Sequence, residues 1–187
     1  TYGMDGLWYG CENGTGVLWV CDIYTYDMWS VGGGGVSLNT LAWDPISNVM
    51  YGMSSNYPGD DTLWEIDPLT GEQDELGDVD LQYVIGMAFN SEGVLYGWDL
   101  VQDALHIIDP ITLDTEEVGS LGININYAQD GDFKRPEDEL YLTAYTLTPQ
   151  YGAYMYKVDT ESGEAESCGQ LPNNWECAAS CFENFCE

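Results

Sequence analysis

The 187-residue sequence predicts an all-β fold made of four antiparallel units, and two repeated features lead to that prediction. The first is Val94-Leu95-Tyr96-Gly97, a short motif that recurs at Leu7–Gly10 and Val49–Gly52 and more loosely at Leu140–Leu142. The second is an aspartate with a glycine ten residues after it: Asp22 and Gly32, Asp67 and Gly77, Asp109 and Gly119, Asp159 and Gly169. No segment of useful length shows the 3.6-residue apolar period of a helix. Self-similarity of this kind is typical of repeat proteins, so we expect short strands and little or no helix.

Residues 5–37 form the first unit. Leu7–Cys11 and Val17–Tyr24 are predicted strands, and the turn residues Asn13–Gly16 between them indicate a hairpin. Met28–Val31 is a third, short strand before a run of four glycines that breaks the pattern.

The next three units are complete, with four short antiparallel strands each and Pro or Gly at their turns. In residues 38–80 the predicted strands are Thr40–Trp43, Val49–Ser54, Leu63–Ile66 and Gln73–Leu76. In residues 81–123 they are Ile85–Phe89, Val94–Trp98, Ala104–Ile108 and Glu116–Val118. In residues 124–172 they are Ala128–Phe133, Glu139–Tyr145, Ala153–Val158 and Ala165–Cys168.

The C-terminus carries a strand that the first unit lacks. In the complete units the first strand ends in an aromatic residue seven or eight positions before a tyrosine: Trp43 before Tyr51, Phe89 before Tyr96, Phe133 before Tyr141. Phe182 lies thirteen residues after Gly169, where the next unit would place this aromatic residue. We therefore expect residues 177–183 to complete the first unit, so that the sequence is circularly permuted by one strand.

Four-stranded units arranged radially form a β-propeller, and pairing of the last strand beside the first removes an open edge. The sequence thus predicts one domain, residues 1–187, folded as a four-bladed propeller. Its blades are residues 5–37 with 177–183, 38–80, 81–123 and 124–172. The alternative is that residues 177–183 complete the first blade of a neighbouring molecule, which would build a filament.

Charge excludes some classes of partner. The chain has 33 acidic residues against 3 Lys and Arg, for a formal net charge of −30. Nucleic acid binding needs a basic surface, so a nucleic acid partner is excluded, and an anionic membrane surface is disfavoured for the same reason. No apolar run is long enough to span a membrane. The acidity fits a self-repelling, solvated surface, a saline habitat or the binding of divalent cations.

Six cysteines predict disulfides, an oxidising compartment and a secreted protein: Cys11, Cys21, Cys168, Cys177, Cys181 and Cys186. Their spacing is not that of paired zinc ligands. If Phe182 pairs opposite Tyr9, Cys181 comes close to Cys11 and a bond could lock the closing strand. Cys21 and Cys168 occupy positions that are apolar in other repeats, so we expect them in the core. No signal peptide is visible, and we expect the chain to be the mature form.

Metal and modification signals are weak. Three acidic pairs in predicted loops are candidate calcium ligands, although none matches an EF-hand and solvated loops are the alternative: Asp60 and Asp61, Asp78 and Asp80, Asp130 and Asp132. Asn13-Gly14-Thr15 is a formal N-glycosylation sequon. No other cofactor is indicated.

Catalytic residues are not indicated either. His106, the only histidine, lies in a predicted strand and corresponds to Trp19, Trp64 and Tyr156 in the other units, so a packing role is expected. The four repeated aspartates fit turns in which each carboxylate bonds nearby backbone. Paired carboxylates for glycoside hydrolysis stay open, because that mechanism depends on their separation in space.

The repeats also resemble a known group of modules. The segments LYGWDLVQDALHIIDPITLDTEEVG and INYAQDGDFKRPEDELYLTAY are similar to repeats of large secreted bacterial surface proteins, of the kind exported by type IX secretion. There, units of the form LYxxD…LYxIDxxTGxxxxVG build propeller-like domains. The resemblance covers residues 7–172; the Cys-rich tail and the segment Ile23–Tyr26 depart from it. It implies a propeller at the cell surface and no particular activity.

Three functions remain open. The first is a non-catalytic, extracellular structural or adhesive module that self-associates, even into a filament, or binds other cell-surface proteins or glycans. The second is a glycan-binding propeller, stabilised by calcium. The third is a carboxylate-based hydrolase. We favour the first, because the chain lacks catalytic motifs and repeats its aspartates symmetrically.

Overall fold

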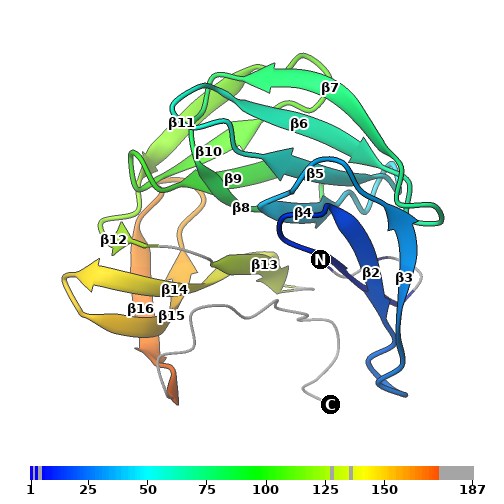
Figure 1. Cartoon of the computed structure of the whole chain (residues 1–187). Coiled ribbons are helices and arrows are strands. Elements are labelled where there is room, and N and C mark those ends of the chain that lie inside the picture. The colour runs from blue at the N-terminus through cyan, green and yellow to red at the C-terminus, as the bar shows by residue number, and fades with distance from the viewer. Residues whose placement is uncertain (2, 4–5, 127–128, 135–136, 173–187) are drawn as a thin grey trace.

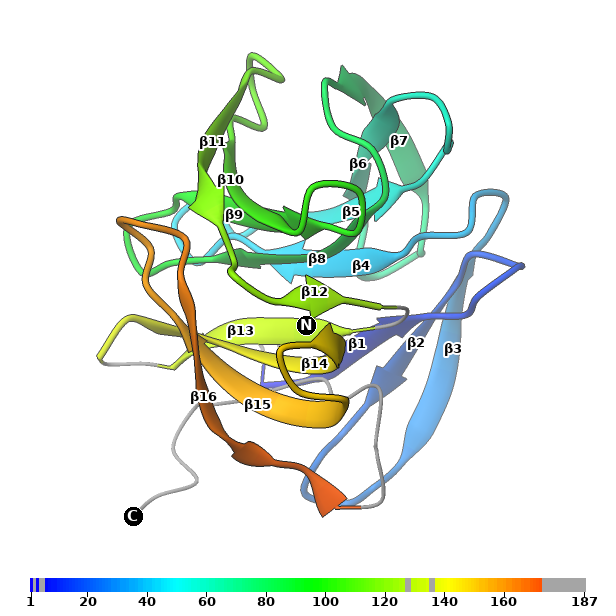
Figure 2. The same cartoon turned by 90° about the vertical axis from the view of Figure 1, so that its left-hand side faces the viewer.

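The computed structural model confirms the all-β prediction. It describes residues 1, 3, 6–126, 129–134 and 137–172, which contain sixteen strands in four antiparallel sheets. Figures 1 and 2 show these sheets standing around a common centre as the blades of a four-bladed β-propeller.

Each sheet is made of strands that follow one another in the sequence, ordered from the centre outwards. Blade 1 contains β1 (Trp8–Cys11), β2 (Val17–Cys21) and β3 (Met28–Gly33). Blade 2 contains β4 (Thr40–Trp43), β5 (Met50–Ser54), β6 (Asp61–Ile66) and β7 (Gln73–Val79). Blade 3 contains β8 (Val84–Phe89), β9 (Leu95–Asp99), β10 (Ala104–Ile108) and β11 (Thr115–Ser120).

Blade 4 has one strand more than predicted. It contains β12 (Asn124–Ile125), β13 (Asp130–Lys134), β14 (Glu139–Thr148), β15 (Gly152–Val158) and β16 (Ala165–Gln170). The ten-residue β14 is long enough to pair with both β12 and β13 along one edge. The inner strands of neighbouring blades contact one another: β1 meets β4, β4 meets β8, and β8 meets β13.

The N-terminal residues extend blade 1 towards the centre. The backbone groups of Thr1 and Tyr9 exchange two hydrogen bonds, of 3.0 and 2.8 Å, and Gly3 N–H donates to the Leu7 carbonyl at 2.8 Å. The predicted closing strand 177–183 lies outside the described residues and stays a prediction. It would compete for the side of β1 that Thr1 and Gly3 occupy.

The register assumed for Phe182 and Tyr9 places the aromatic residue of an inner strand directly opposite the tyrosine, and in blades 2 and 3 that register is wrong by one residue. Tyr51 pairs with Ala42, and Trp43 pairs with Met50. Likewise Tyr96 pairs with Ala88 in blade 3. The aromatic residues still meet, because the Tyr51 and Phe89 rings pack across the blade boundary with centroids 5.5 Å apart.

The repeated aspartates form turns, as predicted. Asp109 Oδ1 accepts hydrogen bonds from the Ile111 and Thr112 backbone N–H groups at 2.8 and 3.1 Å. Equivalent bonds hold the turns after Asp22, Asp67 and Asp159. These backbone donors lower the pKa of Asp109 below its ordinary value. The turns following the third strands thus share one local structure.

The repeated glycines allow one blade to touch the next. A Cβ at Gly119 would clash with the carbonyl oxygen of Ser162, in the turn of blade 4. A Cβ at Gly32 would lie 2.8 Å from the Thr70 carbonyl oxygen, in the turn of blade 2. Gly169 has no such neighbour within 4 Å. The repeated glycine of one blade therefore lies directly against the aspartate turn of the next blade, between blades 1 and 2 and between blades 3 and 4.

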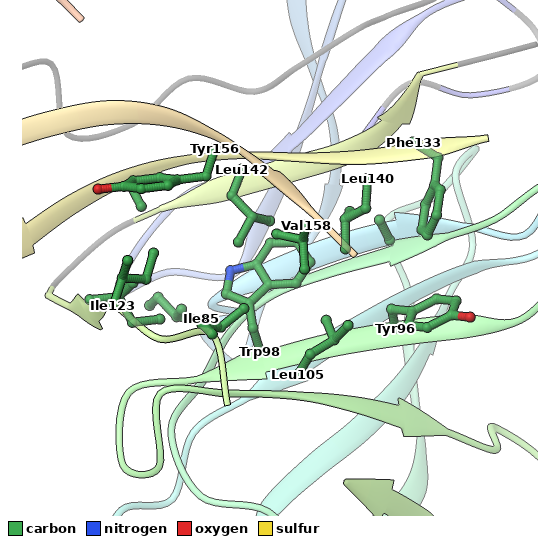
Figure 3. Packing of buried hydrophobic residues seen from close by; sticks show 14 residues of the cluster. Ile85, Tyr96, Trp98, Leu105, Ile123, Phe133, Leu140, Leu142, Tyr156 and Val158 are labelled. Carbon is green, nitrogen blue, oxygen red and sulfur yellow. The ribbon is translucent and has the colours of Figure 1, made fainter. Parts of the chain in front are cut away.

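Trp98 is the central core residue between blades 3 and 4. Its side chain is 0% exposed, and Figure 3 shows it surrounded by Ile85, Leu105, Leu142 and Val158. A Cβ at Gly86 would clash with the indole ring, so the missing side chain there leaves room for it. Such close packing between sheets replaces the core that a single four-stranded sheet cannot form alone.

Candidate functional site

The outer edge of blade 1 differs from the outer edges of the other blades. Trp29 pairs with Val20 on β2, and this position corresponds to carboxylates in the other three outer strands. These are Asp74 on β7, Glu116 on β11 and Glu166 on β16, which pair with Glu65, Ile107 and Lys157. Within the described residues, β3 ends its sheet. Charged side chains normally prevent strand edges from pairing with other chains, and β3 lacks one at this position.

Two further large apolar side chains at or next to β3 are exposed. Met28 is 61% exposed and Trp29 is 40% exposed, and Tyr26, in the preceding turn, is 82% exposed. Tyr26 corresponds to Gly71, which packs against blade 1, and to Gly163, which packs against blade 3. We call Tyr26, Met28 and Trp29 the blade 1 edge. Met28 and Trp29 are consecutive in β3, so they project from opposite faces of the sheet beside a strand edge that has no partner among the described residues. Such an edge, without charged side chains, is a candidate for pairing with another chain.

The predicted calcium ligands do not come together. Asp60, Asp78 and Asp80 are exposed, and the described residues contain no cluster of three or more potential metal-ligating side chains. Asp61 is fully buried, and its Oδ2 accepts the Val84 backbone N–H at 2.6 Å, which ties blade 2 to blade 3. Burial raises the pKa of Asp61. Its role in the described structure is therefore to satisfy backbone donors.

Asp130 and Asp132 lie on the inner strand β13. Each accepts a hydrogen bond from the backbone N–H of the next residue, at 2.9 and 2.8 Å. Burial raises the pKa of Asp130 to about 6. Asp130 lines a cavity of about 300 Å³ where strands of blades 1, 2 and 4 meet, together with Gln129.

Sequence reasoning missed Gln129. The sequence feature that could have pointed to Gln129 is a polar Gln-Asp-Gly-Asp run in a segment whose counterpart in blade 3, Ile85–Phe89, is mostly apolar.

Three of the candidate disulfide cysteines lie in the described residues. Cys11, Cys21 and Cys168 form no disulfide with one another. The bond between Cys11 and Cys181 stays a prediction, because Cys181 lies outside the described residues. Burial raises the pKa of the Cys11 thiol. Cys168 is exposed, which corrects the expectation that it packs in the core, because its outer strand β16 faces solvent. Cys177, Cys181 and Cys186 lie outside the described residues, and pairing among them stays a prediction.

His106 makes a contact that has a counterpart in another blade, and the described residues do not place it in a catalytic triad. Its Nε2 lies 2.8 Å from Asp99 Oδ2, with both side chains buried. The matching contact in blade 2 is the Trp64 indole N–H donating to Ser54 Oγ at 2.9 Å. Asp99 Oδ1 also accepts two backbone N–H groups. This pairing joins the second and third strands of a blade.

The glycosylation candidate Asn13 is exposed at the β1–β2 turn, where its Oδ1 accepts a hydrogen bond from Ser37 Oγ at 3.0 Å. Modification of Asn13 stays a prediction. No helix among the described residues is long and apolar enough to cross a membrane.

The sequence matches no family model and no curated protein. Solved structures share the fold. A chain of a nidogen/laminin complex is 14% identical with a TM-score of 0.63, over 89% of this chain and 62% of that one. An auxiliary nutrient binding protein from Bacteroides thetaiotaomicron is 14% identical with a TM-score of 0.62, over 91% and 41%. Virginiamycin B lyase from Staphylococcus aureus is 14% identical with a TM-score of 0.57, over 95% and 57%.

The chain thus spans between 41% and 62% of the length of these solved chains. At 14% identity the likeness shows the fold alone. The fold is a β-propeller. Because proteins named for binding and for catalysis share it, function has to be argued from the sites of this chain.

Proposed function

We propose that this chain is a non-catalytic structural or adhesive module of a secreted, cell-surface protein, and that it associates with a second copy through the blade 1 edge. The observation that carries the proposal is Trp29, an exposed indole at the position where β7, β11 and β16 have carboxylates. The repeat resemblance to secreted bacterial surface modules supports the extracellular setting.

The geometry of β3 favours strand pairing. Met28–Gly33 is six residues long and has one partner strand, β2, among the described residues. Its outward backbone groups can pair with the same strand of another copy, related by a two-fold axis. The side chains of Met28 and Trp29 would then lose solvent contact. Burial of such aromatic and methionine side chains dominates the stability of protein interfaces.

The charge of the chain sets the conditions for this association. Two copies with a formal charge of −30 each repel one another, and salt screens that repulsion. The apolar contact itself is not weakened by salt. Association through the blade 1 edge should therefore increase as ionic strength rises, which is the opposite of association through ion pairs.

Sedimentation velocity tests the proposal. We expect the wild-type chain to be monomeric at low salt and to form dimers at about 1 M NaCl, where the screening length is about 3 Å. Trp29→Asp, which gives blade 1 the residue of blade 2, should remain monomeric. Leu69→Asp is the matched control, because Leu69 is 82% exposed and lies in the turn of another blade. A wild type that stays monomeric at high salt, or a Trp29→Asp variant that associates equally, would overturn the proposal.

Glycan binding is the second candidate, and a pair of exposed tyrosines favours it. The rings of Tyr57 and Tyr83 lie 5.5 Å apart in an edge-to-face arrangement, and the side chains are 59% and 38% exposed. Such rings offer apolar faces for sugar rings. Titration with oligosaccharides, with and without calcium, should change tyrosine and tryptophan fluorescence in the wild type and not in Tyr57→Ala. Equal responses of both proteins would exclude this pair as the binding site.

A further inference from the structure

The cavity between blades 1, 2 and 4 has a chemical character that the proposed function does not use. Its volume is about 300 Å³, at the lower end of the range for small-ligand sites. Its described lining includes Trp8 and Cys11 from β1, Leu41 from β4, and Gln129 and Asp130 at the start of β13. Inner strands of three blades therefore contribute to one small space near the centre of the ring.

Gln129 is an incompletely satisfied group in this cavity. The side chain is 4% exposed, and its Nε2 donates to the Asn126 carbonyl at 3.3 Å. Its Oε1 is buried and has no hydrogen-bond partner among the described residues. A buried acceptor without a donor destabilises the fold, so native proteins rarely keep one without a ligand or water to satisfy it.

Asp130 adds a second acceptor and a negative charge. Its Oδ1 accepts the Gly131 backbone N–H at 2.9 Å, which leaves Oδ2 available. Burial raises the pKa of this carboxyl to about 6, and the positively charged amino group of Thr1 and the Gly131 N–H act in the opposite direction. The other titratable groups that line the cavity are the amino group of Thr1, the phenol of Tyr9 and the thiol of Cys11. Perturbed groups in a cavity are typical of functional sites.

Asn39 lies at the exposed side of the same cavity. Its Nδ2 donates to the Val84 carbonyl at 3.2 Å, so its Oδ1 is the atom that can face a ligand. The three side chains thus offer an amide oxygen, a carboxylate oxygen and a second amide oxygen. A ligand that fits them must be a hydrogen-bond donor, and a positively charged ligand would add to the favourable effect of the Thr1 amino group on Asp130.

We propose that this cavity binds a small primary ammonium group, held by Gln129 Oε1 and the Asp130 carboxylate with Asn39 at the entrance. An ammonium ion has three N–H donors for these acceptors, and its short carbon chain suits the apolar wall formed by Leu41. Calcium fits less well, because it takes about six to eight oxygen ligands and the described lining has one carboxylate. The strongly negative chain also concentrates cations near its surface.

Isothermal titration calorimetry of the full chain with n-butylammonium chloride tests this proposal. We expect saturable binding at one site per chain. n-Butanol has the same shape without the charge, and tetramethylammonium has the charge without N–H donors. Both should bind at least about 10-fold more weakly, because each loses the charge-assisted hydrogen bonds.

Two variants locate the site. Gln129→Met keeps the length of the side chain and removes the acceptor, and Asp130→Asn removes the charge; each should weaken n-butylammonium binding at least about 10-fold. Asp74→Asn, on the exposed strand β7, removes the same charge elsewhere and should leave binding unchanged. Circular dichroism and thermal melting establish that each variant is folded, and Asp130→Asn carries the test if Gln129→Met does not fold.

The source of the ammonium group is distinguished by a blocked Gly-Lys-Gly peptide. Tighter binding of the peptide than of n-butylammonium would assign the site to a lysine side chain of a partner, and exclusion of the peptide would assign it to a free small amine. No saturable binding of n-butylammonium, equal binding of n-butanol, or wild-type affinity in both cavity variants would overturn the proposal.

Discussion

Individual residues in the centre of this propeller have opposite effects on stability, and Asp130 is the destabilising one. The pKa of its carboxyl is raised to about 6 by burial, compared with 3.8 in an exposed chain. The folded state therefore holds the proton more tightly than the unfolded state. It follows that Asp130 costs nothing at low pH and destabilises the fold increasingly as the pH rises from about 4 to about 6.

Asp130→Asn should raise the free energy of unfolding at pH 7 by up to about 3 kcal/mol, the equivalent of its pKa shift. At pH 4 the variant and the wild type should be nearly equal. Urea unfolding at the two pH values measures this difference, with Asp74→Asn as the control for removing one charge. A variant less stable than the wild type at pH 7 would mean that the carboxylate makes net favourable contacts.

Trp98 is the stabilising counterpart. Its side chain is 0% exposed and lies between blades 3 and 4, so Trp98→Ala leaves a large cavity at their interface. We expect a loss of about 3–5 kcal/mol in the free energy of unfolding. Leu69→Ala should change it by less than about 0.5 kcal/mol, because Leu69 is 82% exposed. Guanidinium unfolding of both variants provides the comparison, and equal losses would contradict this account of the core.

At the scale of elements, the contacts between blades depend on the repeated glycines. Gly119→Ala should destabilise the fold by about 1–3 kcal/mol, because its Cβ would clash with the Ser162 carbonyl oxygen of the next blade. Gly59→Ala is a suitable control. Its Cβ would approach the Asn56 carbonyl oxygen no closer than 3.2 Å, in a loop. Thermal melting compares the two, and a smaller effect at Gly119 would show that the blades shift apart without cost.

Most strands could be predicted because each carries its own signal. Thr40–Trp43 and Ala104–Ile108 match their predicted bounds, since aspartate, proline or glycine residues terminate the apolar runs. The predicted strand Val17–Tyr24 ends early at Cys21, because Asp22 starts a turn by bonding backbone groups. The short β12 has no pattern of its own; it exists because β14 is long enough to offer a second pairing site.

The start of the chain shows what spacing alone could not decide. Tyr2 lies seven residues before Tyr9, the spacing that marks a first strand in the complete units, but sequence reasoning overlooked it and assigned this strand to the segment with Phe182. Thr1 pairs with Tyr9 as Ala88 pairs with Tyr96. Two segments thus carried the same signal, and only coordinates could place one of them. The cavity was equally hidden, because Gln129 meets Trp8 and Leu41 through folding and not through sequence proximity.

At the scale of the whole molecule, charge repulsion opposes the fold. With 33 acidic residues and 3 Lys and Arg, the chain is destabilised by its own charge, and salt should relieve this. We expect the melting temperature to rise with NaCl concentration. Calcium chloride at the same ionic strength separates screening from specific binding. A markedly larger rise with calcium would support the calcium-stabilised alternative, and no rise with NaCl would contradict the repulsion argument.

Hydrogen exchange of the backbone amides tests the central claim most directly, since it reports which strand becomes protected when the chains associate. The measurement compares low salt with about 1 M NaCl, where repulsion between copies is screened. We predict slower exchange in Met28–Gly33 at high salt in the wild type, no such change in Trp29→Asp, and little change in β7, β11 and β16. Protection confined to another blade, or the same exchange in β3 at both salt concentrations, would contradict association through the blade 1 edge.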